Sequence, residues 1–165
     1  MFEEFEKIEK EAHAKSLPVV AWIYPRGKSV KNDVSREMIS YSTRVGLELG
    51  ADIVKIKYGN NISDLKWAVK AAGKTKVVIA GGTKKGEKEF LKQVRDVMSS
   101  GASGLAMGRN IWQHPNPLEI TKKVKDIVFK WYYDFSQGVK RNRPSVFWGK
   151  SKKTRGLFSN DSYKF

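Results

Sequence analysis

The sequence predicts an α/β protein with four consecutive parallel βα units. Four short apolar runs recur along the chain, and segments with helical spacing lie between them. The corresponding strand ends, at Tyr24, Lys55, Gly81 and Gly108, are 31, 26 and 27 residues apart. These steps are close to the length of about 30 residues that a βαβ unit needs. Because such crossovers are right-handed, we expect the four strands to form one parallel sheet.

The first part of the chain predicts two helices and two strands. Apolar residues at helical spacing predict a helix over Phe2–Lys15, which Leu17-Pro18 ends. The run VVAWIY (Val19–Tyr24) predicts a buried strand. The segment Ser35–Gly50 predicts a helix with serine as its N-cap and glycine as its C-terminal stop. The run DIVKIKY (Asp52–Tyr58) predicts the second strand.

The second part repeats this alternation of helix and strand. The expected elements are a helix over Asp64–Ala72 capped by Ser63, a strand over Lys76–Gly82, a helix over Gly86–Ser100, a strand within Gly101–Gly108, and a helix from Pro117 to about Trp131. Beyond residue 130 no periodicity is clear. We therefore expect residues 1–130 to form the folded unit and residues 131–165 an irregular basic tail.

Two architectures fit four βα units. One is a small open α/β sheet, and the other is half of a (β/α)8 TIM barrel, which typically needs about 250 residues. In such a barrel, catalytic residues lie at the C-terminal ends of the strands, and phosphate binds to the loops after strands seven and eight. The sequence matches that layout if its strands are numbers five to eight, the C-terminal half of the barrel.

Composition excludes several classes of protein. The chain has 165 residues and no cysteine, which excludes disulfides and thiolate chemistry. No run of about 18 apolar residues predicts a membrane span, and the N-terminus lacks the apolar core of a signal peptide. We expect a cytoplasmic protein with no membrane partner.

The net charge of +15 is unevenly distributed. Residues 129–165 hold nine Lys/Arg and two Asp/Glu, or +7, and the other 128 residues hold 23 and 15, or +8. A basic tail with aromatic residues can bind nucleic acid, but no nucleic-acid-binding motif accompanies it. We therefore expect a solvated or disordered appendage, with weak binding of anions or nucleic acid as the alternative.

Two lysines in an apolar strand are the first candidates for catalysis. Lys55 and Lys57 share a strand face, and a desolvated amine there can act as the nucleophile of Schiff-base chemistry. Their spacing does not decide between them. Trp22 and Tyr24 also share a face of their strand, and a tyrosine hydroxyl near the lysine can move protons.

Glycines at two successive strand ends predict phosphate binding. Gly81-Gly82 and Gly108 would let backbone N–H groups approach a phosphate, and Arg109 could bind its oxygens. His13 and His114 are far apart in sequence, and no His/Asp/Glu cluster has metal-ligand spacing. The sequence therefore predicts neither a metal site nor a cofactor.

Several motifs agree in order and spacing between Leu17 and Val128: WIYPRG, ELGADIVKIKYGN, WAVKAAGK, VVIAGGTKK, FLKQV and GASGLAMGRNIWQ. In these motifs the chain resembles archaeal-type class I fructose-1,6-bisphosphate aldolases. The resemblance implies that Lys55 forms a Schiff base with dihydroxyacetone phosphate, that Tyr24 acts as general acid/base and that Trp22 lines the site. It also implies that phosphate is held by the glycines and the arginine at Gly81, Gly82, Gly108 and Arg109.

The implied reaction is the reversible cleavage of fructose 1,6-bisphosphate to dihydroxyacetone phosphate and glyceraldehyde 3-phosphate, a step of glycolysis and gluconeogenesis. Heptulosonate synthases of the same superfamily share the lysine and the phosphate loops and are the alternative. A non-catalytic remnant with an anion-binding tail is a third possibility.

The sequence also departs from the family. Strands one to four, and an aspartate near the first strand, have no counterpart, and nothing in Met1–Leu17 replaces them. A lone half-barrel would expose two sheet edges and part of an apolar sheet face. We therefore expect a homo-oligomer or a complementing N-terminal half, and little aldolase activity from the isolated chain.

Overall fold

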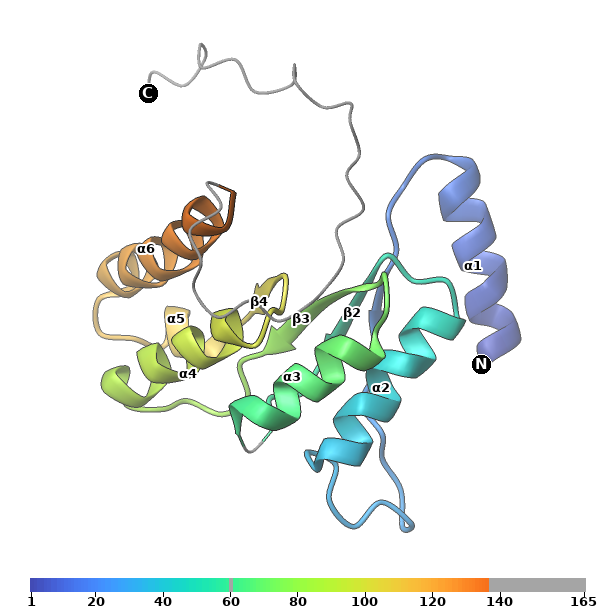
Figure 1. Cartoon of the computed structure of the whole chain (residues 1–165), viewed down its shortest axis with the longest axis horizontal. Helices are drawn as coiled ribbons and strands as arrows, with labels where there is room; N and C mark the ends of the chain where they lie inside the picture. Colours follow the sequence, from blue (N-terminus) through green and yellow to red (C-terminus); the bar gives the residue numbers. More distant parts are fainter. Residues whose placement is uncertain (60, 137–165) are drawn as a thin grey trace.

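The computed structural model describes residues 1–59 and 61–136, and their strands form one parallel sheet in the order β1-β2-β3-β4 (Figure 1). The strands are β1 (Val20–Trp22), β2 (Ile53–Ile56), β3 (Lys76–Ala80) and β4 (Gly104–Ala106). Each strand pairs in parallel with the next one along the chain. The predicted α/β fold with four consecutive parallel βα units is therefore confirmed.

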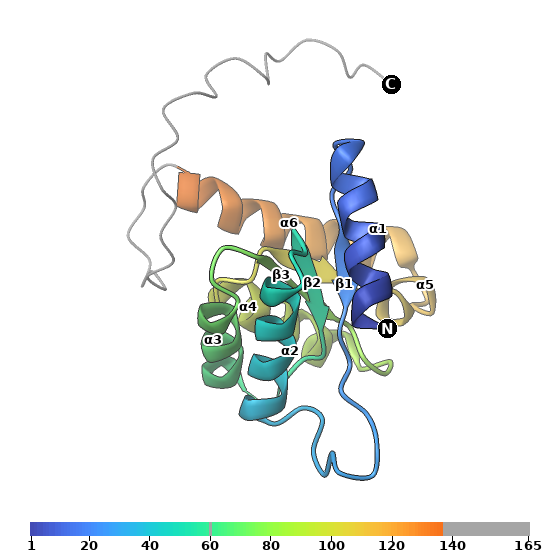
Figure 2. The ribbon, with the colours of Figure 1, turned by 90° about the vertical axis from the view of Figure 1, so that its right-hand side faces the viewer.

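The helices α2, α3 and α4 lie together on one side of the sheet (Figures 1 and 2). The helix α6 packs beside α4, while α1 lies at the opposite end, beyond β1. The helix bounds are α1 (Phe2–Ala14), α2 (Arg36–Glu48), α3 (Ile62–Ala71), α4 (Glu87–Ser99), α5 (Arg109–Trp112) and α6 (Pro117–Ser136). In the described part of the chain, no helix is both long and apolar enough to cross a membrane.

The core lies between the sheet and these three helices. Val54 and Ile56 of β2 and Ile79 of β3 are fully buried there, together with Ile39 of α2 and Leu65 of α3. These residues alternate along each strand with residues of the opposite face, as the pleat of a strand requires. One face of the sheet is therefore fixed by helix packing, and the other face carries the partly buried positions.

That opposite face is open at β1, where the expectation of a buried strand is wrong. The strand spans only Val20–Trp22, and the side chains of Val20 and Trp22 are 46% and 67% exposed, whereas Ala21 is buried. The reason is that β1 is an edge strand, with a neighbouring strand on one side only among the described residues.

The helix starts depend on local capping. The Ser35 hydroxyl accepts a hydrogen bond from the Met38 amide, as predicted for the start of α2. The predicted cap of α3 is wrong, because Asn61 caps this helix by accepting from the Asp64 amide at 3.0 Å. Ser63 then falls inside the helix, where its hydroxyl accepts from the Arg36 guanidinium.

Two features near the end of the described chain differ from the expectation. A four-residue helix, α5, follows β4 directly, and α6 continues to Ser136 instead of ending near Trp131. Residues 137–165 lie outside the described residues. The basic tail, and the boundary expected at residue 130, therefore stay predictions.

The helix α1 is attached to the rest of the fold through polar contacts. None of its residues is fully buried, although Phe2, Phe5 and Ile8 follow a helical spacing. The His13 ring lies 2.9 Å from the Asp52 carboxylate at the start of β2, and this hydrogen bond is the main reason why the pKa of His13 is raised. The contact places α1 beside β1 and the end of α2.

Candidate active site

A cleft at the C-terminal ends of the strands brings most of the predicted site residues together. Its volume is about 810 Å³, and all four strand ends contribute to it. Six of the seven predicted residues line it: Tyr24, Lys55, Gly81, Gly82, Gly108 and Arg109. The expectation that one end of the sheet collects these residues is therefore met in the geometry.

Trp22, the seventh predicted residue, does not line the cleft, but its ring contacts Lys55, which does. The two residues are register partners on adjacent strands, and both belong to the open face. The Lys55 amino nitrogen lies 3.4 Å from the centroid of the Trp22 ring. An aromatic face at this distance attracts a positive charge on the nitrogen, whether it is an ammonium or an iminium.

Lys57 differs from Lys55 in its partner. Its amino group forms an ion pair with Asp33, which belongs to the loop between β1 and α2. Within the described residues, Lys55 forms no such pair and contacts the Trp22 ring instead. Because the Asp33 carboxylate holds the Lys57 amino group in an ion pair, that amine is not free to attack a carbonyl, so the arrangement favours Lys55 over Lys57.

The cleft has two tyrosines that keep their protons at neutral pH. Burial raises the pKa of Tyr24, and the nearby Arg26 charge lowers it by less. Burial and the Asp96 carboxylate raise the pKa of Tyr58 to about 12. The Tyr58 hydroxyl already donates its hydrogen bond to the Asp96 carboxylate, at 3.4 Å. Tyr24 is therefore the better placed proton donor.

Glycine is required in the cleft for two different structural reasons. Gly82 has a φ of +68° and nothing within 4 Å of where a Cβ would lie, so its backbone faces open space. A Cβ on Gly81 would meet the Met107 side chain at 2.9 Å, and one on Gly108 would clash with the Trp112 ring. Gly82 is thus the position where a ligand can reach the backbone, while the other two permit close packing.

Asn110 was not predicted from the sequence as a site residue, yet it joins the two glycine-containing loops. Its side chain is buried, donates to the carbonyls of Gly81 and Thr83 at 3.3 and 3.1 Å, and accepts from the Lys85 amide at 2.7 Å. A buried amide with these partners fixes the loop after β3 against the loop after β4. Its position directly after Arg109 was the only signal in the sequence.

The charge of the cleft indicates an anionic ligand. Five basic residues line it, and no Asp or Glu of the described chain does. Two of the five, Lys57 and Lys85, have carboxylate partners in Asp33 and Glu89. Arg26 and Lys85 were not predicted, although Arg26 follows Tyr24 so closely that its place in the site could be inferred. Such a cluster attracts phosphate groups.

The two histidines lie in separate contacts. His13 pairs with Asp52 and Glu9, and His114 pairs with Glu87 at the other end of the sheet. In the part of the chain that the structure describes, no group of three or more His, Asp or Glu side chains lies close enough to hold a metal ion. The cleft therefore offers an amine, a phenol and several cations for chemistry.

Comparison with known proteins finds similarity to aldolases. A family model described as DeoC/LacD family aldolase matches residues 1–114. The class 1 fructose-bisphosphate aldolase of Thermoproteus tenax is 45% identical over 130 residues, which are 78% of this chain and 49% of the relative. A 2-amino-3,7-dideoxy-D-threo-hept-6-ulosonate synthase of Archaeoglobus fulgidus is 41% identical over 112 residues, 68% of this chain and 40% of the relative.

This chain also resembles a solved structure in fold. That structure is an archaeal fructose-1,6-bisphosphate aldolase whose catalytic lysine is covalently bound to the carbinolamine intermediate of the substrate. The TM-score is 0.76 at 44% identity, over 78% of this chain and 52% of the other. This chain thus spans about half the length of the relatives that it matches, and its four βα units correspond to half of a (β/α)8 barrel. The match over residues 1–114 and the shared fold show that the chain belongs to the DeoC/LacD family of aldolases.

Proposed function

We propose that this chain carries the Schiff-base half of a class I aldolase that acts on fructose 1,6-bisphosphate. The observation that carries the proposal is the contrast between two lysines of one cleft. Lys57 is paired with Asp33, whereas the Lys55 amine lies against the Trp22 ring in a cleft lined by basic residues. The named activity of the Thermoproteus tenax relative supports the choice of reaction.

The first half of the reaction forms the covalent intermediate. The uncharged Lys55 amine attacks the C2 ketone of the sugar phosphate and gives a carbinolamine. Tyr24, which burial keeps protonated, donates its proton to the carbinolamine hydroxyl, so that water leaves and an iminium forms. The face of the Trp22 ring stabilises the positive charge of that iminium.

The second half breaks the carbon–carbon bond. The Tyr24 phenolate takes the proton of the C4 hydroxyl, the electrons of the C3–C4 bond move into the iminium, and glyceraldehyde 3-phosphate leaves. Protonation of the resulting enamine at C3 and hydrolysis of the iminium release dihydroxyacetone phosphate and restore the lysine. Gly82 and Arg109 are the proposed phosphate ligands, and Gly81 and Gly108 shape the same loops.

A heptulosonate synthase is the second candidate, because the Archaeoglobus fulgidus relative has 41% identity to this chain. The bisphosphate aldolase is favoured since its identity is higher and extends over 130 residues rather than 112. Both enzymes would use Lys55, so product analysis with each substrate separates them. A cytoplasmic location follows as part of the proposal for a metabolic enzyme of this kind.

The test is cleavage of fructose 1,6-bisphosphate, followed by coupling the release of dihydroxyacetone phosphate to NADH oxidation. The full chain is assayed alone and after co-refolding with the half of the Thermoproteus tenax aldolase that it does not match. We expect the chain alone to stay well below the roughly 1 s⁻¹ that is typical of enzymes, because it spans only about half the length of its relatives.

The co-refolded sample should cleave the sugar faster, and Lys55→Met should abolish that activity. Lys57→Met is the matched control, and it should retain measurable cleavage, since the paired lysine is not the nucleophile. Cleavage that survives Lys55→Met, or a complex of verified mass that cleaves nothing, would contradict the proposal.

A further inference from the structure

One large apolar side chain lies exposed in the cleft of the described chain. Trp112, the last residue of α5, lines the cleft and is 67% exposed. The two tyrosines that line the same cleft, Tyr24 and Tyr58, are only partly exposed. Five basic residues line the cleft as well, so the indole is an apolar surface within a strongly cationic site. Ligand sites commonly combine such an aromatic surface with a few charged groups.

The position of the indole is fixed by Gly108. Trp112 lies one turn after Gly108, and its amide donates to the Gly108 carbonyl at 3.2 Å. Side chains of a helix lean back over the preceding turn, and a Cβ at Gly108 would clash with the six-membered ring of the indole. Glycine therefore lets the ring rest directly on the backbone. A ring that is already held in place loses little freedom when a ligand binds to it.

The indole lies next to the proposed phosphate ligands. Arg109 precedes Trp112 by three residues, so the two side chains leave α5 from neighbouring positions, and both line the cleft. Lys55 lines the same cleft. A phosphate ester held by Arg109 would therefore extend its carbon chain into a site that has the indole as an apolar wall.

We propose that Trp112 determines specificity, because its ring binds the carbon chain of phosphate esters and so separates them from inorganic phosphate. Inorganic phosphate has only oxygen atoms, which the cationic side chains bind. An ester also has C–H groups, and these displace water from the exposed indole. The inference rests on the proposed function for its ligand class, the phosphorylated sugars, but it requires no reaction at Lys55.

The two other exposed tryptophans of the described chain differ in their surroundings. Trp22 contacts Lys55 but does not line the cleft. Trp67 lies on α3, also outside the cleft, with the Lys70 amino nitrogen 5.7 Å from the centroid of its ring. Because Trp67 is 54% exposed, its replacement is a matched control for the loss of an exposed indole far from the proposed ligand.

The experiment compares the affinities of propyl phosphate and inorganic phosphate by isothermal titration of the full chain at about pH 8, where both carry close to two negative charges. Propyl phosphate has no carbonyl group, so Lys55 cannot react with it and the titration measures binding alone. We expect the unsubstituted chain to bind the ester about tenfold more tightly than inorganic phosphate, through the apolar area that the ester buries.

Trp112→Ala should remove this preference and leave the affinity for inorganic phosphate unchanged within about twofold. Trp112→Phe should restore most of the preference, because it keeps an aromatic face beside Arg109. Gly108→Ala should act like Trp112→Ala, since the added Cβ displaces the ring without removing it. Trp67→Ala should bind both ligands as the unsubstituted chain does. Urea unfolding confirms that each variant is folded.

Three results would overturn the proposal. A folded Trp112→Ala variant that still prefers the ester would show that the indole does not contact the carbon chain. Equal weakening of both ligands in that variant would show that the ring only supports the loop. Binding of neither ligand by the folded, unsubstituted chain would remove the site itself. The Schiff-base chemistry is tested separately, by trapping on Lys55, so the two proposals can fail independently.

Discussion

At the scale of single residues, Asn110 links the loop after β3 to the loop after β4. Its amide contacts the loop after β3 at three backbone atoms, while its own backbone belongs to the helix after β4. It touches no reacting group in the proposed mechanism, so we regard it as a positioning residue. If both loops bind one anion, as proposed, they need such a link, because each loop leaves the sheet from a different strand end.

We predict that Asn110→Ala lowers stability by about 1–3 kcal/mol, the usual cost of leaving buried hydrogen-bond partners unpaired. It should also weaken the binding of inorganic phosphate about tenfold, since the Gly82 backbone and Arg109 would no longer be held together. Urea unfolding measures the first effect and isothermal titration the second. The neighbouring Gln113→Ala, an exposed residue of the same turn, should change neither quantity. Unchanged phosphate binding in Asn110→Ala would show that the two loops act separately.

Single residues also show which parts of the candidate site could be predicted from the sequence and which could not. Six of the seven predicted residues line one cleft, since the ends of parallel strands always meet at one edge. The choice between Lys55 and Lys57 could not be made from spacing, because it depends on Asp33, a loop residue whose place is set by tertiary structure. The roles proposed for these residues remain predictions.

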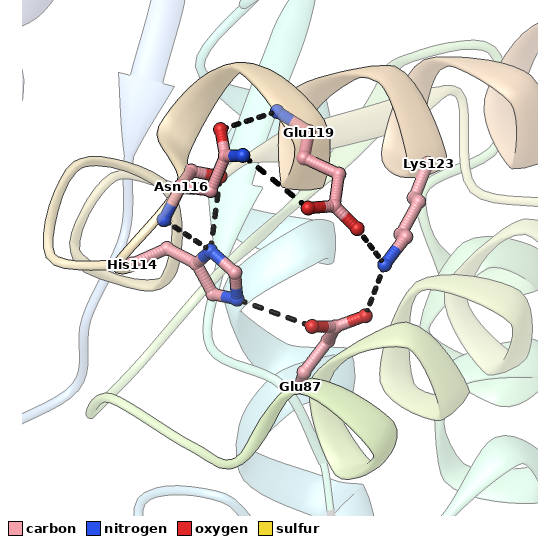
Figure 3. A network of polar contacts seen from close by, with 5 residues as sticks. All are labelled: Glu87, His114, Asn116, Glu119 and Lys123. Atoms are coloured by element: carbon pink, nitrogen blue, oxygen red, sulfur yellow. Dashed lines mark hydrogen bonds and ion pairs between the residues drawn. The ribbon is translucent and has the colours of Figure 1, made fainter.

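At the scale of elements, a polar network joins α4 to α6 (Figure 3). Glu87 in the first turn of α4 accepts from Lys123 of α6 at 2.7 Å and lies 3.3 Å from the His114 ring. Asn116 caps the start of α6 by accepting from the Glu119 amide. The Lys123 contact, more than any other, lowers the pKa of Glu87 below its ordinary value of 4.5. The network therefore holds α6 beside α4 near the β4 end of the sheet.

We predict that Glu87→Gln destabilises the fold at pH 7 and that the difference disappears in acid. A carboxyl group whose folded-state pKa is lowered contributes stability above its unfolded value, and loses it as the pH falls through the folded pKa. The gap in urea midpoint between the two proteins should therefore close below about pH 4. Glu11→Gln, in which the lost pair with Lys15 lies within one exposed helix, should show a smaller gap at pH 7. A gap that persists at pH 3 would mean that packing, not charge, is lost.

Helices and strands were predicted more completely than the contacts between residues. The two errors have local causes. The alternation of apolar runs and helical spacing located all four strands and five of the six helices in the described residues. The helix α5 has only four residues, too few for a period to be seen. The strand β1 was expected to be buried because its sequence is apolar, but burial depends on a covering partner that the strand's own sequence does not encode.

At the scale of the whole molecule, the chain is half of a barrel with a site at its rim. Lys55, Tyr24 and the two glycine-containing loops proposed to bind phosphate all line one cleft, while the described strands supply only half of a barrel wall around it. The barrel half was predicted from four strands with even spacing and from the resemblance to class I aldolases. We therefore predict low activity for this chain alone, since loosely held reactants lose about 100-fold in rate when misplaced by about 1 Å.

The most direct measurement traps the Schiff base. The folded chain is incubated with dihydroxyacetone phosphate, reduced with borohydride, digested and mapped by mass spectrometry. Reduction makes the adduct irreversible, so even a slowly formed iminium accumulates as labelled protein. The labelled residue then identifies the nucleophile without full turnover. We predict one adduct on Lys55, its loss in Lys55→Met and its retention in Lys57→Met. A label on Lys57, a label that survives Lys55→Met, or no label at all on the folded chain would contradict the account.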